Sequence, residues 1–232
     1  MSRYQKFLVL SFLIVWGLAA YHPNFPHDWL LENYLVFFFV PIIILLGRYF
    51  KLSNVSYTLI TLFLCLHVVG SHYTYEKVPF GYFLQSVMNS DRNMYDRLVH
   101  FSFGFLLAYP VRELFMRVAK TKGFWSYYFP IDLVAAGSAI YEIIEWLAAA
   151  NVDPVAGIAF LGSQGDIWDA QKDMLAATVG AIIAMIIIAT INAYLDKNFW
   201  KELVSSFKIN KSDEPLGEVK LQKLILKKNK KR

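Results

Sequence analysis

Long apolar blocks with few charged residues are the feature of this sequence that most restricts its fold. Examples are the stretches 7–18, 34–46 and 176–191. A bilayer core about 30 Å thick requires roughly 20 mostly apolar residues per helix, which several blocks reach with their polar flanks. Only 18% of the 232 residues are charged, too few to cover a soluble domain of this size. The sequence therefore predicts an all-α fold, a polytopic bundle of transmembrane helices.

The apolar blocks predict six transmembrane helices followed by a basic cytoplasmic tail at 196–232. The first block follows Arg3 and Lys6 like a secretory signal, but residues 17–21 lack a small-x-small cleavage site, so we expect an uncleaved helix. The tail carries eleven Lys and Arg against five Asp and Glu, and we expect it to lie against anionic lipid. The predicted spans are 7–21, 34–50, 55–71, 95–117, 128–149 and 173–194.

The distribution of Lys and Arg predicts the orientation, because basic residues stay on the cytoplasmic side. With the N-terminus inside, the cytoplasmic segments hold nineteen basic residues and the outer segments hold four, and without the tail the ratio is still eight to four. We therefore expect both termini in the cytoplasm. The basic charge lies where a membrane-surface anchor would place it, which argues against nucleic-acid binding. One cysteine, Cys65, excludes an intrachain disulfide.

Ionisable residues in the predicted spans gather toward the external side of the membrane. At the bilayer centre such a group costs about 2.5–3.5 kcal/mol, so it usually faces the bundle interior and serves a function. On the predicted topology, ten acidic and histidine side chains from four segments converge there: His67, His72, Glu76, Asp96, His100, Glu142, Glu145, Asp166, Asp169 and Asp173.

Helical spacing places some of these side chains on common faces. Asp96 and His100 are four residues apart, and Glu142 and Glu145 are three apart, so each pair shares a face. Two neighbouring carboxylates in an apolar run cannot both ionise without a cation, a proton or a basic partner. The Glu142–Glu145 pair is therefore the strongest candidate for a functional role.

Structural roles compete with the functional interpretation at the other positions. His67 and His72 are five residues apart and point about 140° away from each other, so at most one faces a shared cavity directly. A lone His67 is more often a hydrogen-bonded core residue than a ligand. Glu76 and Asp166 suit a wet loop or a helix N-terminus, whose dipole favours acids.

Four stretches resemble the YjdF-like family of bacterial inner-membrane proteins of unknown function. They are residues 67–76 (HVVGSHYTYE), 95–101 (YDRLVHF), 141–146 (YEIIEW) and 162–174 (GSQGDIWDAQKDM). The resemblance covers about residues 5–195 and implies a multi-pass protein of the bacterial inner membrane. A more distant resemblance is to VanZ-like proteins, associated with low-level glycopeptide resistance, through Asp96-Arg-x-x-His100 and Glu142-x-x-Glu145. Here Glu145 stands where that family has Gln.

The convergent side chains favour, as a first hypothesis, a metal-dependent hydrolase or transferase acting on a lipid or lipid-linked envelope molecule. Divalent cations take carboxylate ligands, and zinc also accepts histidine. The predicted ligands are Glu142, His100, Asp169 and Asp173, with Glu145 or His72 as general base. The remaining polar positions of the predicted site are His67, Asp96, Asp166 and Glu76.

Three other hypotheses stay open on the sequence alone. A non-catalytic binder would hold an amphiphile or drug at the outer leaflet, with Glu142 and Glu145 meeting its cationic groups. A small proton-coupled transporter would use the paired carboxylates as a relay, although no internal repeat supports it. A purely structural membrane protein would leave the acid pairs without a physical explanation.

Overall fold

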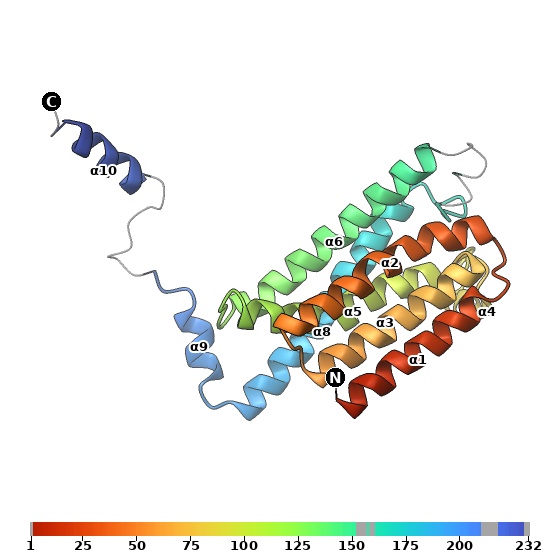
Figure 1. Ribbon diagram of the computed structural model, residues 1–232, viewed down its shortest axis with the longest axis horizontal. Coiled ribbons are helices and arrows are strands. Elements are labelled where there is room, and N and C mark those ends of the chain that lie inside the picture. Colours follow the sequence, from red (N-terminus) through yellow and green to blue (C-terminus); the bar gives the residue numbers. More distant parts are fainter. Residues whose placement is uncertain (1, 152–156, 158–160, 210–217, 230–232) are drawn as a thin grey trace.

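The computed structural model describes residues 2–151, 157, 161–209 and 218–229, and within these ranges its regular secondary structure is entirely α-helical (Figure 1). This confirms the predicted all-α fold class. The helices are α1 (Arg3–Ala20), α2 (Pro26–Tyr49), α3 (Asn54–Tyr73), α4 (Pro79–Met88), α5 (Tyr95–Arg117), α6 (Trp125–Ala150), α8 (Asp169–Leu195), α9 (Phe199–Ser205) and α10 (Glu218–Asn229).

Five helices in the described residues, α1, α2, α3, α6 and α8, are long and apolar enough to cross a membrane. Helix α5 has 23 residues, long enough to cross as well, but it carries charged side chains at both ends, among them Asp96, Arg97, Arg112 and Glu113. Each of the six predicted spans overlaps one of these six helices. Crossing by length and composition is therefore supported for five of them.

Consecutive long helices run antiparallel, as polar contacts at one end of the bundle show. The Tyr4 hydroxyl lies 2.7 Å from the Thr58 hydroxyl, which joins the starts of α1 and α3. Glu113, near the end of α5, accepts a hydrogen bond at 2.9 Å from the backbone N–H of Ser53, the N-cap residue of α3. Asn192, near the end of α8, donates to the Tyr127 hydroxyl of α6 at 2.7 Å. The starts of α1, α3 and α6 thus share one end of the bundle with the ends of α5 and α8.

The opposite end of the bundle collects the remaining helix ends. His72, at the end of α3, contacts the Ala19 carbonyl at the end of α1 through Nδ1 at 2.9 Å. Asn33 of α2 donates to the Ser71 hydroxyl of α3 at 3.3 Å. The starts of α2, α5 and α8 therefore lie beside the ends of α1, α3 and α6. We call this the acidic end, because it holds the acidic residues described below.

Helices α5 and α8 pack most closely, because glycine lies at both sides of their crossing. A Cβ added at Gly104 would meet the Ala177 carbonyl oxygen, and one added at Gly180 would meet the Phe101 carbonyl oxygen. Small residues let helix backbones approach in this way. The buried apolar cluster here consists of Ala108, Val134, Ala177, Ala181, Ala184 and Met185. Helix α5 is thereby enclosed by α3, α6 and α8.

The helices differ from the prediction at two places. Helix α2 begins at Pro26, eight residues before the predicted start, with Pro in its first turn and Asp28 favoured there by the helix dipole. The segment after 195 is not wholly a separate tail, because α9 packs against the start of α6. The Trp125 indole N–H donates to the Ser206 carbonyl at 2.9 Å, and Phe199 is buried.

Candidate functional site

A small polar cavity lies at the acidic end of the bundle. Its volume is about 30 Å³, enough for a small ion or a few water molecules and too small for an organic substrate. Helices α2, α5, α6 and α8 contribute, together with the turn after α3 and residues 161–162. The lining residues are Asp28, Glu32, Thr74, Tyr75, Asp96, Glu142, Glu145, Leu161, Gly162, Asp169 and Asp173.

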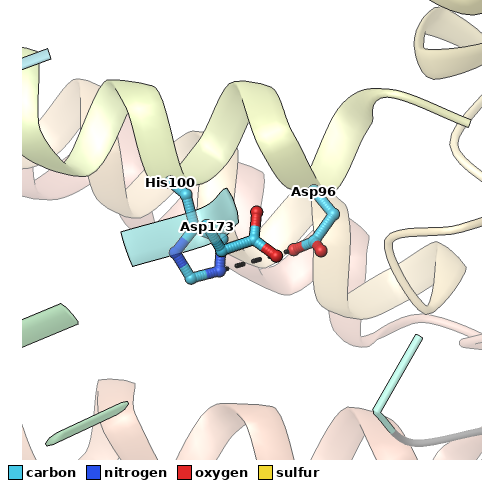
Figure 2. Close-up of side chains that lie close together, drawn as sticks. All are labelled: Asp96, His100 and Asp173. Carbon is cyan, nitrogen blue, oxygen red and sulfur yellow. Dashed lines mark ion pairs between the residues drawn. The ribbon is translucent and has the colours of Figure 1, made fainter. Parts of the chain in front are cut away.

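Asp96, His100 and Asp173 form the tightest group of metal-ligand side chains in the described residues. One ligand atom from each lies within 4.8 Å of the others, and Figure 2 shows the three side chains turned toward one another. The two α5 residues share a face because they are four apart, and Asp173 faces them from the first turns of α8. Asp173 and His100 are buried.

Glu142 of α6 extends this group. Its Oε1 lies 3.5 Å from His100 Nε2, and the Asp96 Oδ1 lies 3.6 Å from the same nitrogen. Both separations exceed a normal hydrogen bond. Atoms that bind one ion at about 2.0–2.3 Å lie roughly 3–4 Å apart, so these spacings fit ligands arranged around a common centre. Glu142 Oε1 is buried and has no hydrogen-bond partner among the described residues.

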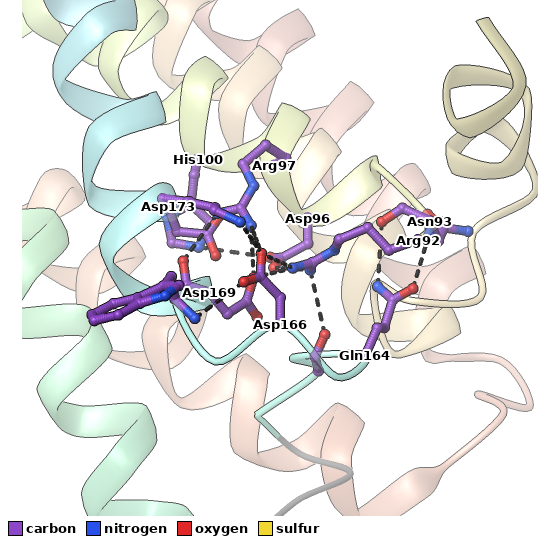
Figure 3. Close-up of polar contacts among 12 residues, drawn as sticks. Arg92, Asn93, Asp96, Arg97, His100, Gln164, Asp166, Asp169 and Asp173 are labelled. Carbon is purple, nitrogen blue, oxygen red and sulfur yellow. Dashed lines mark hydrogen bonds and ion pairs between the residues drawn. The ribbon is translucent and has the colours of Figure 1, made fainter. Parts of the chain in front are cut away.

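Two guanidinium groups hold the start of α8 against the start of α5 (Figure 3). Arg97 lies 2.7 Å from Asp169 Oδ1 and 2.7 Å from Asp173 Oδ1. The Arg97–Asp173 contact is an ion pair without the geometry of a hydrogen bond, because Asp173 Oδ1 has no directed donor among the described residues. Arg92 also pairs with Asp169 and lies 3.6 Å from Asp96.

The loop before α8 is tied to the segment before α5. The Gln164 side chain accepts a hydrogen bond from the Asn93 backbone N–H at 2.8 Å (Figure 3).

Burial alone would lower the pKa of the Arg92 guanidinium, but the hydrogen bond and charge of Asp169 outweigh burial and raise that pKa. At the rim, the hydrogen bond from Lys172, 2.7 Å from Asp166, lowers the pKa of the Asp166 carboxyl.

The structure brings together most, but not all, of the predicted site residues. Asp96, Glu142, Glu145, Asp169 and Asp173 line the cavity, with His100 in contact with two of them and Asp166 at the rim. Asp169 is held by both guanidinium groups, which compete with any metal ion for its oxygens. The geometry therefore favours Asp96 over Asp169 as the third carboxylate of a ligand set.

The two other histidines and Glu76 do not join this group. His67 is buried, with Nε2 3.2 Å from the Glu32 carbonyl and Nδ1 2.5 Å from the Tyr75 hydroxyl. A neutral ring with its proton on Nε2 satisfies both contacts, so His67 is a core residue. His72 contacts the Ala19 carbonyl instead of the cavity, which argues against its predicted role as a base. Glu76 pairs with neighbouring Lys77 at 3.7 Å.

Sequence reasoning missed four participants in the site. Asp28 and Glu32 lie in the first two turns of α2, ahead of the predicted start at 34. Glu32 accepts a hydrogen bond from the Tyr141 hydroxyl at 2.9 Å. The proline at 26 followed by an acid was the signal for an earlier helix start. Arg92 and Arg97 were counted among the four basic residues of the predicted outer segments.

The charges around the cavity do not balance. Seven carboxylates line it, from Asp28, Glu32, Asp96, Glu142, Glu145, Asp169 and Asp173. Two guanidinium groups, Arg92 and Arg97, pair with members of this set, and Lys172 reaches only the rim. Buried carboxylates without counter-charges must take up protons or bind a cation. The arrangement is thus suited to cation binding or to sharing protons.

Comparison with known proteins identifies relatives of the chain. Residues 4–194 match a family model described as "Predicted membrane protein (DUF2238)". The chain is 38% identical over 195 residues to the inner membrane protein YjdF of Escherichia coli (strain K12), covering 82% of this chain and 93% of that protein. No solved structure matches. The comparisons do not show the VanZ-like resemblance, which stays a prediction.

Proposed function

The chain belongs to the DUF2238 family of predicted membrane proteins, and from that premise we propose that it binds a divalent metal ion at the acidic end of its bundle. In this proposal the ion serves hydrolysis or group transfer on a lipid or lipid-linked molecule of the cell envelope. An inner membrane protein, as its relative is described, has access to such substrates.

The observation that carries the proposal is the grouping of Asp96, His100 and Asp173 within 4.8 Å. Glu142 adds a fourth donor 3.5 Å from the His100 ring. One imidazole and three carboxylates are a donor set that zinc accepts, and a divalent charge offsets part of the carboxylate excess. The ligands come from α5, α6 and α8, which pack against one another.

Glu145 is the group best placed to act as general base. It lies one turn beyond Glu142 on the same helix and lines the same cavity. A carboxylate near a bound ion can accept a proton from water activated by that ion. The cavity holds an ion and little more, so the substrate would approach from its mouth at the membrane surface.

Elemental analysis tests the metal site directly. We expect about one divalent ion per wild-type chain and loss of that ion in the Asp96→Asn, Asp173→Asn double variant. Glu76→Gln is the matched control, because it removes an acid at the same end that does not line the cavity. Equal metal content in the double variant and wild type, with both folded, would overturn the metal site.

A turnover assay separates catalysis from metal binding alone. Incubation with an extract of envelope lipids, followed by mass spectrometry, should reveal a product formed by wild type. Glu145→Gln should retain the metal and lose activity by about 10²-fold or more, the usual scale for a general base. Metal binding with no product from any lipid class would exclude the enzymatic role and leave a binding site.

A non-catalytic binder of a cationic amphiphile is the second candidate. The observation that favours it is the carboxylate excess, since Glu32, Glu142 and Glu145 line the cavity and neither guanidinium group pairs with them in the described residues. An ammonium group at the mouth would meet these acids. The binder predicts saturable binding of a cationic amphiphile to metal-free protein, without turnover.

The proposal also includes six transmembrane spans with both termini in the cytoplasm. Enclosure of α5 by α3, α6 and α8 supports a sixth span, because a helix surrounded by protein need not be apolar throughout. Antiparallel alternation of six spans returns the chain to its starting side. The basic residues near the starts of α1, α3 and α6 favour the cytoplasm for that side. The cavity would then face outward.

A further inference from the structure

A second cavity lies at the other end of the bundle, between α5, α6, α8 and α9. Its volume is about 280 Å³, against about 30 Å³ for the cavity at the acidic end, so it has room for a small organic group. Its lining residues are Arg112, Met116, Lys122, Gly123, Ser126, Tyr127, Asn192, Asp196, Phe199, Glu202 and Leu203. The function proposed above does not use any of them.

Arg112 is the central cation of this cavity. Its guanidinium carbon lies 4.3 Å from the centre of the Tyr127 ring, and Nη2 donates to the Ser126 hydroxyl at 3.4 Å. Nε is buried without a hydrogen-bond partner, and no carboxylate lies within ion-pair distance of the side chain, among the described residues. A half-buried guanidinium without a counter-charge is costly, and an anion in the cavity would remove that cost.

Both signs of charge line the cavity. Lys122 joins Arg112 as a second cation, and Asp196 and Glu202 supply two carboxylates. In the part of the chain that the structure describes, none of the four forms an ion pair within 4.0 Å. Lys122, Asp196 and Glu202 are exposed, so a ligand can reach them at the open side of the cavity. Held apart around a space of this size, they fit a ligand that carries both signs itself.

The walls of the cavity are fixed by specific contacts. Gly123 has φ +53, and a Cβ there would lie 2.5 Å from the Glu202 carbonyl oxygen, so the turn before α6 and α9 touch directly. The Phe124 backbone N–H donates to the Ser206 hydroxyl at 3.1 Å. Helix α9 therefore has a fixed place over the cavity, because the contact needs glycine at that position.

The cavity is flanked by side chains typical of a membrane–water interface. Trp125 and Trp200 are exposed beside it, at the starts of α6 and α9. Tryptophan is enriched at the level of the lipid headgroups. From Asp96 to Arg112, α5 rises about 24 Å, close to the thickness of a hydrocarbon core, so the proposed crossing of α5 would put the two cavities at opposite interfaces.

We infer that this second cavity binds a phosphate group linked to an ammonium group, as in a phosphoethanolamine headgroup. Arg112 and Lys122 meet the phosphate, and Asp196 and Glu202 meet the ammonium. The phosphate is bound by charge-assisted hydrogen bonds, for which the guanidinium fork is well shaped. The same chemistry is offered by the headgroup of a membrane lipid and by free phosphoethanolamine, and the test distinguishes these two sources.

Native mass spectrometry of the full chain in detergent tests the inference. The probes are short-chain phosphatidylethanolamine, short-chain phosphatidylglycerol and free phosphoethanolamine, each at matched concentration. We expect wild type to retain phosphatidylethanolamine, and Arg112→Gln to weaken that binding by about tenfold or more, the scale of a lost charge-assisted hydrogen bond. Arg48→Gln is the matched control, because it removes an exposed arginine at the end of α2 outside the cavity.

A separate variant, Glu202→Gln, tests the proposed contact with the ammonium group. Glu202 is exposed on α9, so Glu202→Gln should leave the fold intact and reduce the preference for phosphatidylethanolamine over phosphatidylglycerol. The Glu202→Gln measurement tests the proposed binding site even if Arg112→Gln fails to fold. Arg112→Lys keeps the charge and gives a second measure of the phosphate contact.

The binding measurements distinguish a lipid headgroup from free phosphoethanolamine as the ligand. Retention of the lipid but not of free phosphoethanolamine assigns the site to a lipid headgroup, and retention of both at similar concentrations assigns it to the free compound; either supports the site. Equal binding of phosphatidylethanolamine by wild type and a folded Arg112→Gln variant would overturn the inference. So would equal retention of both lipids by wild type. None of these results depends on metal at the acidic end, so the two proposals fail or stand separately.

Discussion

Arg97 joins the start of α5 to two acidic residues of α8 at the acidic end. Its guanidinium pairs with Asp169 and with Asp173 and donates to the Asp169 carbonyl at 3.0 Å. The side chain is only 14% exposed, so these contacts are largely shielded from water. Removing one member of a shielded ion pair leaves its partner with an uncompensated charge, which costs more than the pair itself contributes.

Arg97→Gln should therefore lower the free energy of unfolding by about 3 kcal/mol, the scale seen when a buried pair loses one partner. Thermal or denaturant unfolding in detergent measures the change. Lys77→Gln is the control at the same end, because the Lys77–Glu76 pair is 3.7 Å apart and its lysine is 44% exposed. Its loss should cost less than about 1 kcal/mol. Equal effects of the two substitutions would contradict the shielding argument.

Individual site residues were predictable only where local spacing decided their direction. Asp96 and His100 were placed correctly on one face, because four residues make about one helical turn. The roles of His67 and Asp169 depend on partners distant in sequence: Tyr75 and the Glu32 carbonyl for one, Arg92 and Arg97 for the other. The spacing of residues along one helix does not indicate which side chains of other helices will contact them.

At the scale of elements, the close crossing of α5 and α8 sets the position of the acidic end. Gly104 and Gly180 lie on the facing sides of the two helices, and each would place a Cβ against the other helix's backbone. Backbone atoms cannot turn aside as a flexible side chain can. The crossing therefore needs glycine at both points, and the alignment of Asp96 and His100 with Asp173 depends on it.

Gly104→Ala should separate α5 from α8 and lower the free energy of unfolding by about 1–3 kcal/mol, the usual cost of overpacking. Gly180→Ala should act in the same way. Gly17→Ala is the control, because a Cβ there meets nothing within 4 Å and alanine favours a helix more than glycine. Unfolding of the three variants in one detergent gives the comparison. A Gly104→Ala protein as stable as Gly17→Ala would show that the crossing is looser than described.

The sequence predicted helix boundaries correctly where polarity changed sharply along the chain. The prediction was less accurate where polarity changed gradually. The predicted range 95–117 coincides with α5, whose start is marked by the polar run before Tyr95 and whose end is marked by Arg117. The start of α2 was placed late because Asp28 and Glu32 interrupt the apolar pattern. These acids face a polar cavity rather than lipid, so hydropathy alone could not assign them to the helix.

At the scale of the whole molecule, charge is divided between two unlike cavities. The acidic end has more carboxylates than cations in a space of about 30 Å³, whereas the other end has two cations and two carboxylates around about 280 Å³. An excess of one sign in a small space suits a small ion of the opposite sign. Balanced charges around a larger space suit a ligand that carries both. Their separation along α5 supports the proposal that the two cavities lie at opposite faces of a membrane.

Topology is the whole-molecule prediction on which that assignment rests, and α5 is the helix that decides it. If α5 crosses, six spans place both termini in the cytoplasm and residue 151 outside. If α5 does not cross, α6 runs inward, residue 151 lies inside and the C-terminus emerges outside. Alkaline phosphatase, active only outside the cytoplasm, should therefore be active when fused after residue 151 and inactive when fused after residue 232. A fluorescent protein should give the reverse pattern at the same two points, and a phosphatase active only at the C-terminal fusion would limit the chain to five spans.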